Sequence, residues 1–170
     1  KVYYLERTQR VAADRDAVFA FFDRPENLSE LTPAGMKFQR LTPSPITMKD
    51  GAIIDFVVRV HGLPMRWRSL ITAYDPPHRF VDEQLLGPYS FWHHTHAFGA
   101  LPDGGTELTD TVRYALPFGP LGRLAHTLAV RRQLEQIFRH REQVVAARFG
   151  VAAAPAATSG GTATASPETS

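Results

Sequence analysis

The segment DPPHRFVDEQLLGPYSFWHHTHAF, residues 75–98, decides the fold class of this chain. Two runs rich in β-branched and aromatic residues, 79–86 and 89–100, meet at the turn dipeptide Gly87-Pro88. This arrangement predicts a β-hairpin. An isolated hairpin is barely stable in water, so the neighbouring sequence should supply further strands and an element that covers them.

Five more runs of the same kind flank the hairpin, and proline, glycine and aspartate turns separate most of them. They lie at residues 1–12, 36–42, 52–61, 65–74 and 106–116. Together with the hairpin they predict seven strands. Most of the connections are too short for parallel crossovers, so the sheet should be antiparallel.

Three helical segments complete the pattern. Asp14 is a suitable N-cap for a first short helix, and Pro25 can begin a second. A longer helical pattern follows residues 117–120 and continues to about Arg148. Its apolar stripe changes face part-way along, which predicts a bend or break near 127–131. The fold class is therefore α+β, and the long helix should cover the apolar face of the sheet.

The composition limits the possible functions. A formal net charge of +2 is too small to indicate nucleic-acid binding. The chain has no cysteine, which excludes disulfides and cysteine-ligated metal sites. No apolar run reaches the roughly 18–20 residues of a membrane span, so integral membrane association is not expected. Because no signal peptide is recognisable, we expect a cytoplasmic protein.

The chain divides at Gly150. Residues 1–150 are long enough to bury one substantial core and should form a single domain. Residues 151–170, VAAAPAATSGGTATASPETS, contain no aromatic and no basic side chain. Such a segment cannot bury enough apolar surface to offset the entropy of ordering it, so we expect a disordered tail.

The histidines of FWHHTHAF, residues 91–98, should fall on two faces of their strand. Period-two alternation separates neighbouring side chains. One face carries Trp92, His94, His96 and Phe98. Because large apolar residues stand at both ends of that set, we expect it to face the core and His93 to lie on the outer face.

Neighbouring strands should extend this inner face. A tight turn after residue 86 would place Glu83 opposite Trp92, and a three-residue loop within 102–106 would place Asp110 opposite Phe98. Ionisable groups among aromatic ones require mutual hydrogen bonds or a wet cavity. The candidate ligand-binding residues are Phe56, Trp67, Glu83, Trp92, His94, His96, Phe98, Asp110 and Tyr114.

Two other features have ordinary interpretations. The basic residues Arg131, Arg132, Arg139, His140 and Arg141 should form a solvated helix face, with contact to an anionic membrane or a partner as the alternative. Residues 117–122 should connect strand to helix. Alternatively, they form part of the mouth of a cavity.

Three blocks of sequence carry a resemblance to a known superfamily. They are AVFAFFDRPENLSELTP (17–33), the segment 75–98, and GGTELTDTVRYALPFGPLGRLAHTLAVRRQLEQIF (104–138). These blocks resemble the bacterial ligand-binding SRPBCC proteins, whose superfamily includes START lipid-transfer domains, Bet v 1-like allergens and aromatic polyketide cyclases.

The resemblance extends over residues 3–148. It implies a helix-grip fold, in which a seven-stranded antiparallel sheet wraps around a long C-terminal helix, two short helices follow the first strand, and a hydrophobic cavity is enclosed. It implies a START-like ligand-binding domain over residues 1–150. It implies no catalytic residue.

Three interpretations of His94 and His96 remain open. They can be neutral cavity-wall residues that orient a ligand through hydrogen bonds. With Asp110 they can act as acid–base groups of a cyclase or dehydrase. With a carboxylate from Asp110 or Glu83 they can hold zinc or iron, although a His-x-His pair alone is a weak signal.

The sequence favours the first interpretation. We expect a protein that binds or carries a hydrophobic or aromatic small molecule in an internal cavity, with no cofactor and no metal. The alternatives are a polyketide cyclase/dehydrase-like enzyme using His94, His96 and Asp110, and an interaction module whose cavity is vestigial.

Overall fold

The computed structural model describes residues 1–60 and 62–153. Its sheet confirms the predicted fold class, because seven strands pair antiparallel in the order β1-β7-β6-β5-β4-β3-β2. The strands are β1 (Val2–Val11), β2 (Gln39–Arg40), β3 (Ile53–Val60), β4 (Leu63–Asp75), β5 (Arg79–Leu86), β6 (Phe91–Ala100) and β7 (Thr106–Ala115). The predicted hairpin is the β5–β6 pair.

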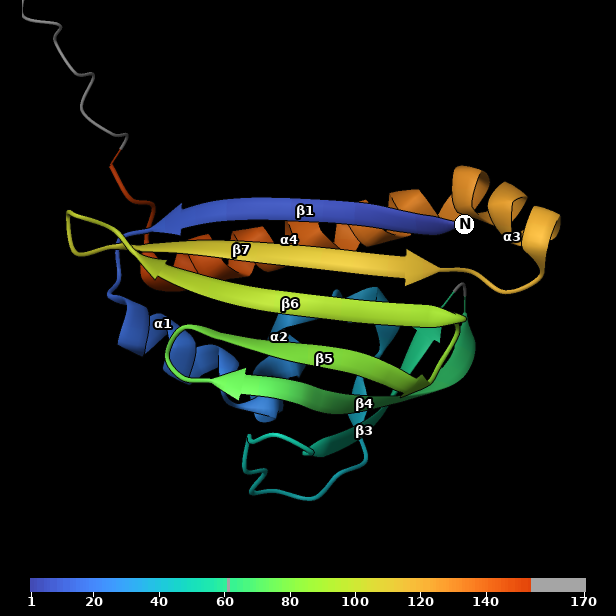
Figure 1. Cartoon of the computed structure of the whole chain (residues 1–170), viewed down its shortest axis with the longest axis horizontal. Coiled ribbons are helices and arrows are strands. Elements are labelled where there is room, and N and C mark those ends of the chain that lie inside the picture. Colours follow the sequence, from blue (N-terminus) through green and yellow to red (C-terminus); the bar gives the residue numbers. More distant parts are fainter. Residues whose placement is uncertain (61, 154–170) are drawn as a thin grey trace, which may run out of the picture.

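Helices cover one side of this sheet. They are α1 (Arg15–Phe22), α2 (Leu28–Leu31), α3 (Gly119–Ala125) and α4 (Arg131–Phe149), with single turns η1 (Pro25–Asn27) and η2 (Ala34–Met36) and the π-helical segment η3 (His126–Val130). In Figure 1, α4 runs behind β1 and β7, while α1 and α2 lie behind the other half of the sheet. The molecule therefore has two layers, with the long helix as the second layer, as predicted.

Local sequence explains where these helices begin and break. The carboxylate of Asp14 accepts a hydrogen bond from the backbone N–H of Ala17 at 3.0 Å, which caps α1 as predicted. The π-helical segment η3 lies at 126–130, where the change of apolar face predicted a break. A π turn interrupts the regular ladder of hydrogen bonds, so η3 separates α3 from α4.

The core has two parts. In the first, phenylalanines of α1 pack on β5 and β6, and the ring of Phe19 lies 5.2 Å from that of Phe98 and 6.2 Å from that of Phe80. The second joins the sheet to α4 through Trp92, Val112, Tyr114, Leu134 and Phe138. Apolar contacts thus hold both α1 and α4 against the sheet.

The register of β5 against β6 differs from the prediction by one residue. Asp82 lies opposite His94 and Glu83 opposite His93, because the connection is the four-residue segment 87–90. The side chain of Gln84 stabilises this longer loop, since it exchanges two hydrogen bonds with the backbone of Tyr89. A shift of one residue exchanges the two faces of a strand, so Glu83 lies on the outer face and Asp82 on the inner one.

The register of β6 against β7 differs by two residues. Asp110 lies opposite His96 rather than Phe98, because residues 101–105 form the connection instead of a three-residue loop. A shift of two preserves the faces. Asp110 and Tyr114 therefore remain on the inner side of β7, as predicted.

Two residues that follow Gly150 contact the end of β1. Val151 forms a β-bridge with Val11, and the N–H of Ala152 donates to the carbonyl of Arg10 at 3.3 Å. The rest of the predicted tail, residues 154–170, lies outside the described residues. Within the described part of the chain, no helix is long and apolar enough to cross a membrane.

Candidate functional site

A cavity of about 540 Å³ lies between the sheet and the helices. Its walls are largely apolar, with a buried polar region where β5, β6 and α4 meet. Other polar side chains also line it: Arg24, Thr32, Ser69 and Gln133. Five of the nine predicted residues line it: Phe56, Trp67, Trp92, His94 and His96. Lining residues that the prediction did not include are Asp82, Tyr89, Phe138 and Arg141, among others.

Four predicted residues lie elsewhere. Glu83 is on the outer face, where its carboxylate is 4.0 Å from the ring of His93. Phe98 packs in the core against Phe19, and Tyr114 stacks on Tyr3 with ring centroids 5.5 Å apart. Asp110 is buried behind the histidines and does not line the cavity. These four residues therefore do not line the cavity, and their direct contact with a ligand stays a prediction.

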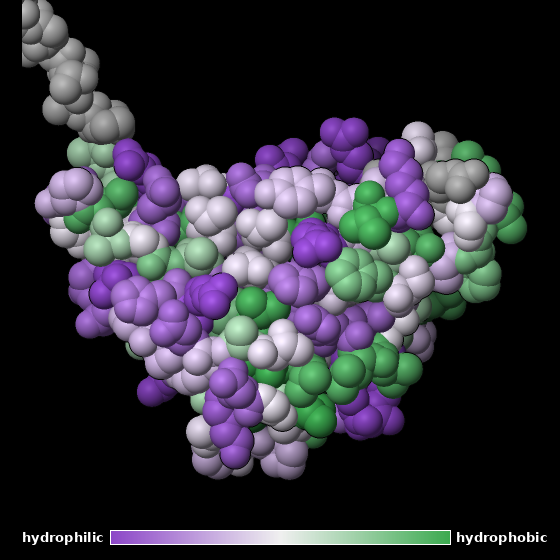
Figure 2. Space-filling view, in the orientation of Figure 1, coloured by the Kyte–Doolittle hydropathy of each residue, from purple (hydrophilic) through white to green (hydrophobic). Residues whose placement is uncertain are grey.

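The cavity opens beside the β7–α3 connection. Phe118 and Leu121 both line it, yet they are 80% and 72% exposed to solvent. Figure 2 shows hydrophobic residues gathered at the end of the molecule where α3 lies. The alternative role predicted for residues 117–122, as part of the cavity mouth, agrees with this placement.

Aromatic side chains form the wall next to the polar region. The rings of Trp67 and Trp92 meet edge to face at 5.2 Å, and Tyr89 lies 4.8 Å from Trp92. Phe56 stacks on Trp67 at 5.8 Å. Flat rings at these separations offer an apolar surface that suits a planar ligand.

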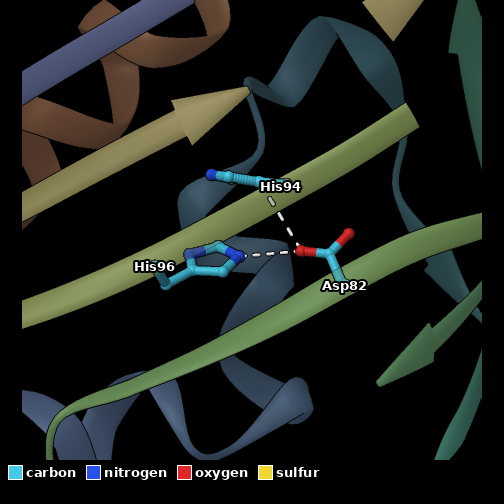
Figure 3. Close-up of side chains that lie close together, drawn as sticks. All are labelled: Asp82, His94 and His96. Carbon is cyan, nitrogen blue, oxygen red and sulfur yellow. Dashed lines mark hydrogen bonds and ion pairs between the residues drawn. The ribbon is translucent and has the colours of Figure 1, made fainter. Parts of the chain in front are cut away.

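The polar region contains the two histidines that the alternation placed inward. Both are 6% exposed, whereas His93 on the outer face is only half-buried. Figure 3 shows both imidazoles extending from β6 toward one oxygen of Asp82 on β5. The Nε2 of His96 is 2.8 Å from Asp82 Oδ2, and the Nδ1 of His94 is 3.5 Å from the same oxygen.

A second carboxylate lies behind the rings. Oδ1 of Asp110 is 2.9 Å from His94 Nε2 and 2.9 Å from Nη2 of Arg141. The same Nη2 is 3.0 Å from Nδ1 of His96. Arg141 is 8% exposed, which contradicts the prediction that it belongs to a solvated basic face.

These contacts assign the ring protons. An ionised carboxylate only accepts hydrogen bonds, so His94 donates from Nε2 to Asp110, and its Nδ1 carries the lone pair. The carboxylate of Asp82 likewise accepts from Nε2–H of His96 at 2.8 Å. Nδ1 of His96 lies between two groups, 3.0 Å from Nη2 of Arg141 and 3.1 Å from Oδ1 of Asp110. One donor nitrogen of each histidine is thereby fixed by a carboxylate.

The protonation states follow from burial and from these partners. Burial, together with the neighbouring His96, lowers the pKa of His94 to about 4, so its ring is neutral near pH 7. Burial would raise the pKa of Asp110, but the charge of Arg141 and hydrogen bonds from both histidines hold it well below its ordinary value. In the same way, burial opposes the ionisation of Asp82, but the hydrogen bond from His96, the two neighbouring imidazoles and Trp92 together outweigh burial, so that the pKa of Asp82 is lowered.

The two buried carboxylates have different partners. Asp110 is paired with the guanidinium of Arg141, whereas the titratable groups that contact Asp82 among the described residues are the two histidines. The indole N–H of Trp92 contributes to the lowered pKa of Asp82 but makes no hydrogen bond of ordinary geometry. A carboxylate at the edge of an apolar cavity favours a ligand group that donates hydrogen bonds.

The metal interpretation finds a different third ligand from those predicted. Asp82, rather than Glu83 or Asp110, joins His94 and His96, with one potential ligand atom from each within 4.8 Å of the others. A metal on this side would require a proton-free Nε2 on His96, and therefore loss of the hydrogen bond that this nitrogen donates to Asp82 at 2.8 Å. A proton on Nδ1 of His96 would then have Oδ1 of Asp110 as an acceptor at 3.1 Å. The three residues can therefore either hold a metal or present polar groups to an organic ligand.

Comparison with known proteins supports the fold. No protein-family model and no curated protein matches the chain. Among solved structures, the Zhui aromatase/cyclase of Streptomyces sp. R1128 is similar at a TM-score of 0.70 and 17% identity, over 87% of this chain and 93% of that one.

Two plant proteins are also similar. A norcoclaurine synthase of Thalictrum flavum gives a TM-score of 0.61 at 13% identity, over 87% of this chain and 96% of that one. The major latex-like protein 151 of Panax ginseng gives 0.54 at 16% identity, over 79% and 96%. These likenesses, together with the sheet order and the long last helix, show that the chain has the helix-grip fold.

Proposed function

We propose that this protein binds a hydrophobic, aromatic small molecule in the cavity between the sheet and α4. The observation that carries the proposal is the cavity itself, about 540 Å³ of largely apolar space with a small number of polar side chains. Ligand sites in proteins typically have volumes of roughly 300–1,000 Å³ and combine apolar walls with a few polar groups that orient the ligand.

The aromatic wall supports the class of ligand. Trp67, Trp92 and Tyr89 present ring faces and edges next to the polar region, and rings in offset or edge-to-face contact gain about 0.5–1.5 kcal/mol beyond their buried area. A planar aromatic molecule can use this wall along its whole length. An aliphatic chain would gain only the free energy of burying its apolar area.

Shared fold with a cyclase and a synthase makes catalysis the second candidate. The dyad of His94 and Asp110 also favours it, because Nδ1 of His94 is an unprotonated base beside the cavity. However, the pKa of His94 is about 4, whereas a general base is most effective when its pKa lies near the working pH. Binding is therefore the better-supported function.

Intrinsic fluorescence provides a direct test, because the chain has two tryptophans and both line the cavity. We expect saturable quenching when the protein is titrated with uncharged two- and three-ring aromatic compounds. Ile137→Phe should weaken binding several-fold, since Ile137 of α4 lines the cavity and the larger ring fills it.

The matched control is Gln136→Phe, which adds the same ring at the neighbouring exposed position of α4. It should bind as the unmodified protein does. If a varied aromatic panel produces no saturable signal with folded protein, or if both variants bind equally, the cavity is not the binding site.

A further inference from the structure

We propose that the polar region of the cavity selects ligands with a hydrogen-bond donor, a hydroxyl or an ammonium group, attached to the aromatic part. This inference rests on the proposed binding function and specifies the chemistry of the ligand. It follows from the geometry of Asp82 and His94, the two residues that form what we term the acceptor corner.

The acceptor corner contains two acceptors that face each other. His94 donates from Nε2 to Asp110, so its Nδ1 has only a lone pair to offer. That Nδ1 lies 3.5 Å from Oδ2 of Asp82, an ionised carboxylate oxygen. Two acceptors at this separation repel each other, and neither can satisfy the other. A donor placed at hydrogen-bonding distance from both would relieve the repulsion.

The surrounding residues do not supply enough donors. Among the described residues, His96 makes the one hydrogen bond of ordinary geometry to Asp82. Arg141 is directed elsewhere, because its Nη2 contacts Asp110 and His96 and its guanidinium lies over the ring of Phe22 at 4.6 Å. Asp82 can accept several hydrogen bonds, so it retains unused capacity beside the cavity.

Charge leads to the same conclusion. Arg141 pairs with Asp110 and so does not balance Asp82, and the His94 ring beside Asp82 is neutral near pH 7. A hydroxyl donor stabilises such a carboxylate through a charge-assisted hydrogen bond, and an ammonium group additionally balances its charge. A ligand with only acceptors would add a third lone pair to the corner and be disfavoured.

The position of the corner defines how the ligand lies. The ring of Trp92 is 6.1 Å from that of His94 on the same strand, so the aromatic wall begins directly beside the corner. An aromatic ring against Trp92 and Trp67 can therefore direct a substituent at its edge toward Asp82 and His94. The expected ligand therefore carries both features in one molecule: an aromatic ring for the tryptophans and a donor group for the acceptor corner.

Four probes with the same ring system test the inference in the unmodified protein. They are 2-naphthol and naphthalen-2-ylmethanamine, which donate, 2-methoxynaphthalene, which only accepts, and 2-methylnaphthalene, which does neither. We expect the two donors to bind at least about ten-fold more tightly than the methyl compound, as a hydrogen bond to a charged group implies. If the amine binds more tightly than the naphthol, charge balance contributes more to the affinity than the hydrogen bond alone.

Asp82→Asn tests the assigned residue, because it keeps the shape of the side chain and replaces one acceptor by a donor. Selection for donors should be lost, and the methoxy compound should gain affinity. Glu83→Gln is the matched control, since it makes the same chemical change at the adjacent residue on the outer face. It should preserve the order of the four affinities.

The possible outcomes separate the two proposals. If none of the four probes binds, the binding function itself is wrong. If all four bind equally, or if the methoxy compound binds best, the cavity binds aromatic ligands but the acceptor corner does not select donors. Tight binding of Zn²⁺ that Asp82→Asn abolishes would also overturn the inference, because the corner would then be a metal site.

Discussion

Arg141 of α4 and Asp110 of β7 form a buried ion pair, with Nη2 and Oδ1 2.9 Å apart and both residues at most 8% exposed. The pair connects the long helix to the sheet behind the two histidines. Removal of one member leaves the other charge buried without a partner, which typically costs 3–5 kcal/mol. The ion pair therefore has consequences for both stability and the site.

We expect Arg141→Met to lower the free energy of unfolding by about 3–5 kcal/mol, because Asp110 keeps its charge in a buried position. Chemical denaturation measures this change. Arg148→Met is the control on the same helix, since Arg148 pairs with Glu30 at the surface, where both side chains are 50% exposed. That pair should contribute about 1 kcal/mol or less. Equal effects of the two substitutions would contradict the buried pairing.

The three neighbouring histidines should differ in their contribution to stability. His93→Ala should change the free energy of unfolding by about 0.5 kcal/mol or less, as surface substitutions usually do. His94→Ala should cost about 1–3 kcal/mol, because Asp110 loses a buried hydrogen-bond donor. Replacement of His96 should cost a similar amount through Asp82. If chemical denaturation shows that His93→Ala destabilises the protein as much as replacement of His94 or His96, the assignment of faces is wrong.

Much of the site could be predicted from local periodicity. Alternation along β6 correctly placed His94 and His96 inward and His93 outward, because a strand has no other way to arrange consecutive side chains. The break at η3 was also predictable, since the apolar positions on either side of it cannot share one straight face. These features depend on neighbouring residues alone.

Features that depend on loop conformation could not be predicted. The side chain of Gln84 stabilises a four-residue loop, which shifts β5 by one residue and brings Asp82 inward in place of Glu83. The alternation of β5 by itself does not reveal the hydrogen bonds between the side chain of Gln84 and the backbone of Tyr89. Residues of the turn determine the register, and a one-residue shift changes every side chain of the strand to the other face.

Arg141 was missed for a different reason. Arg139, His140 and Glu142 surround it in sequence, so charge alone suggested a solvated face. Helical spacing contained the correct signal, because Arg141 lies three residues after Phe138 and four before Val145, and both of these are buried. A charged residue in register with an apolar stripe indicates a buried partner, which here is Asp110.

Stability should depend on pH through His94. Its pKa falls from 6.5 to about 4 in the folded protein, mainly because burial disfavours the charged ring. Between these values the unfolded chain binds more protons than the folded one, so stability rises with pH over this window and is lost as the pH falls toward 4. Because the pKa values of Asp82 and Asp110 are also lowered in the folded protein, their protonation causes a further loss of stability at still lower pH.

Denaturant midpoints measured across this window test the dependence. His94→Gln should flatten the change between pH 6.5 and about 4, because the titrating ring is gone. His93→Gln should leave it unchanged, since that ring lies on the outer face. A variant without His94 that shows the full pH dependence would assign the effect to another group.

The last prediction concerns the mouth of the cavity. Phe118 is 80% exposed and also lines the cavity, so it covers the opening without contributing to the core. Phe118→Ser should therefore change the free energy of unfolding by about 0.5 kcal/mol or less. It should increase the rate of ligand dissociation, because a bound molecule loses the ring that lies across its exit. Stopped-flow displacement of a fluorescent aromatic ligand measures that rate.

Val2→Ser is the control, since Val2 is 57% exposed on β1 and does not line the cavity. It should leave both stability and dissociation unchanged, whereas an unchanged dissociation rate in Phe118→Ser would place the exit elsewhere.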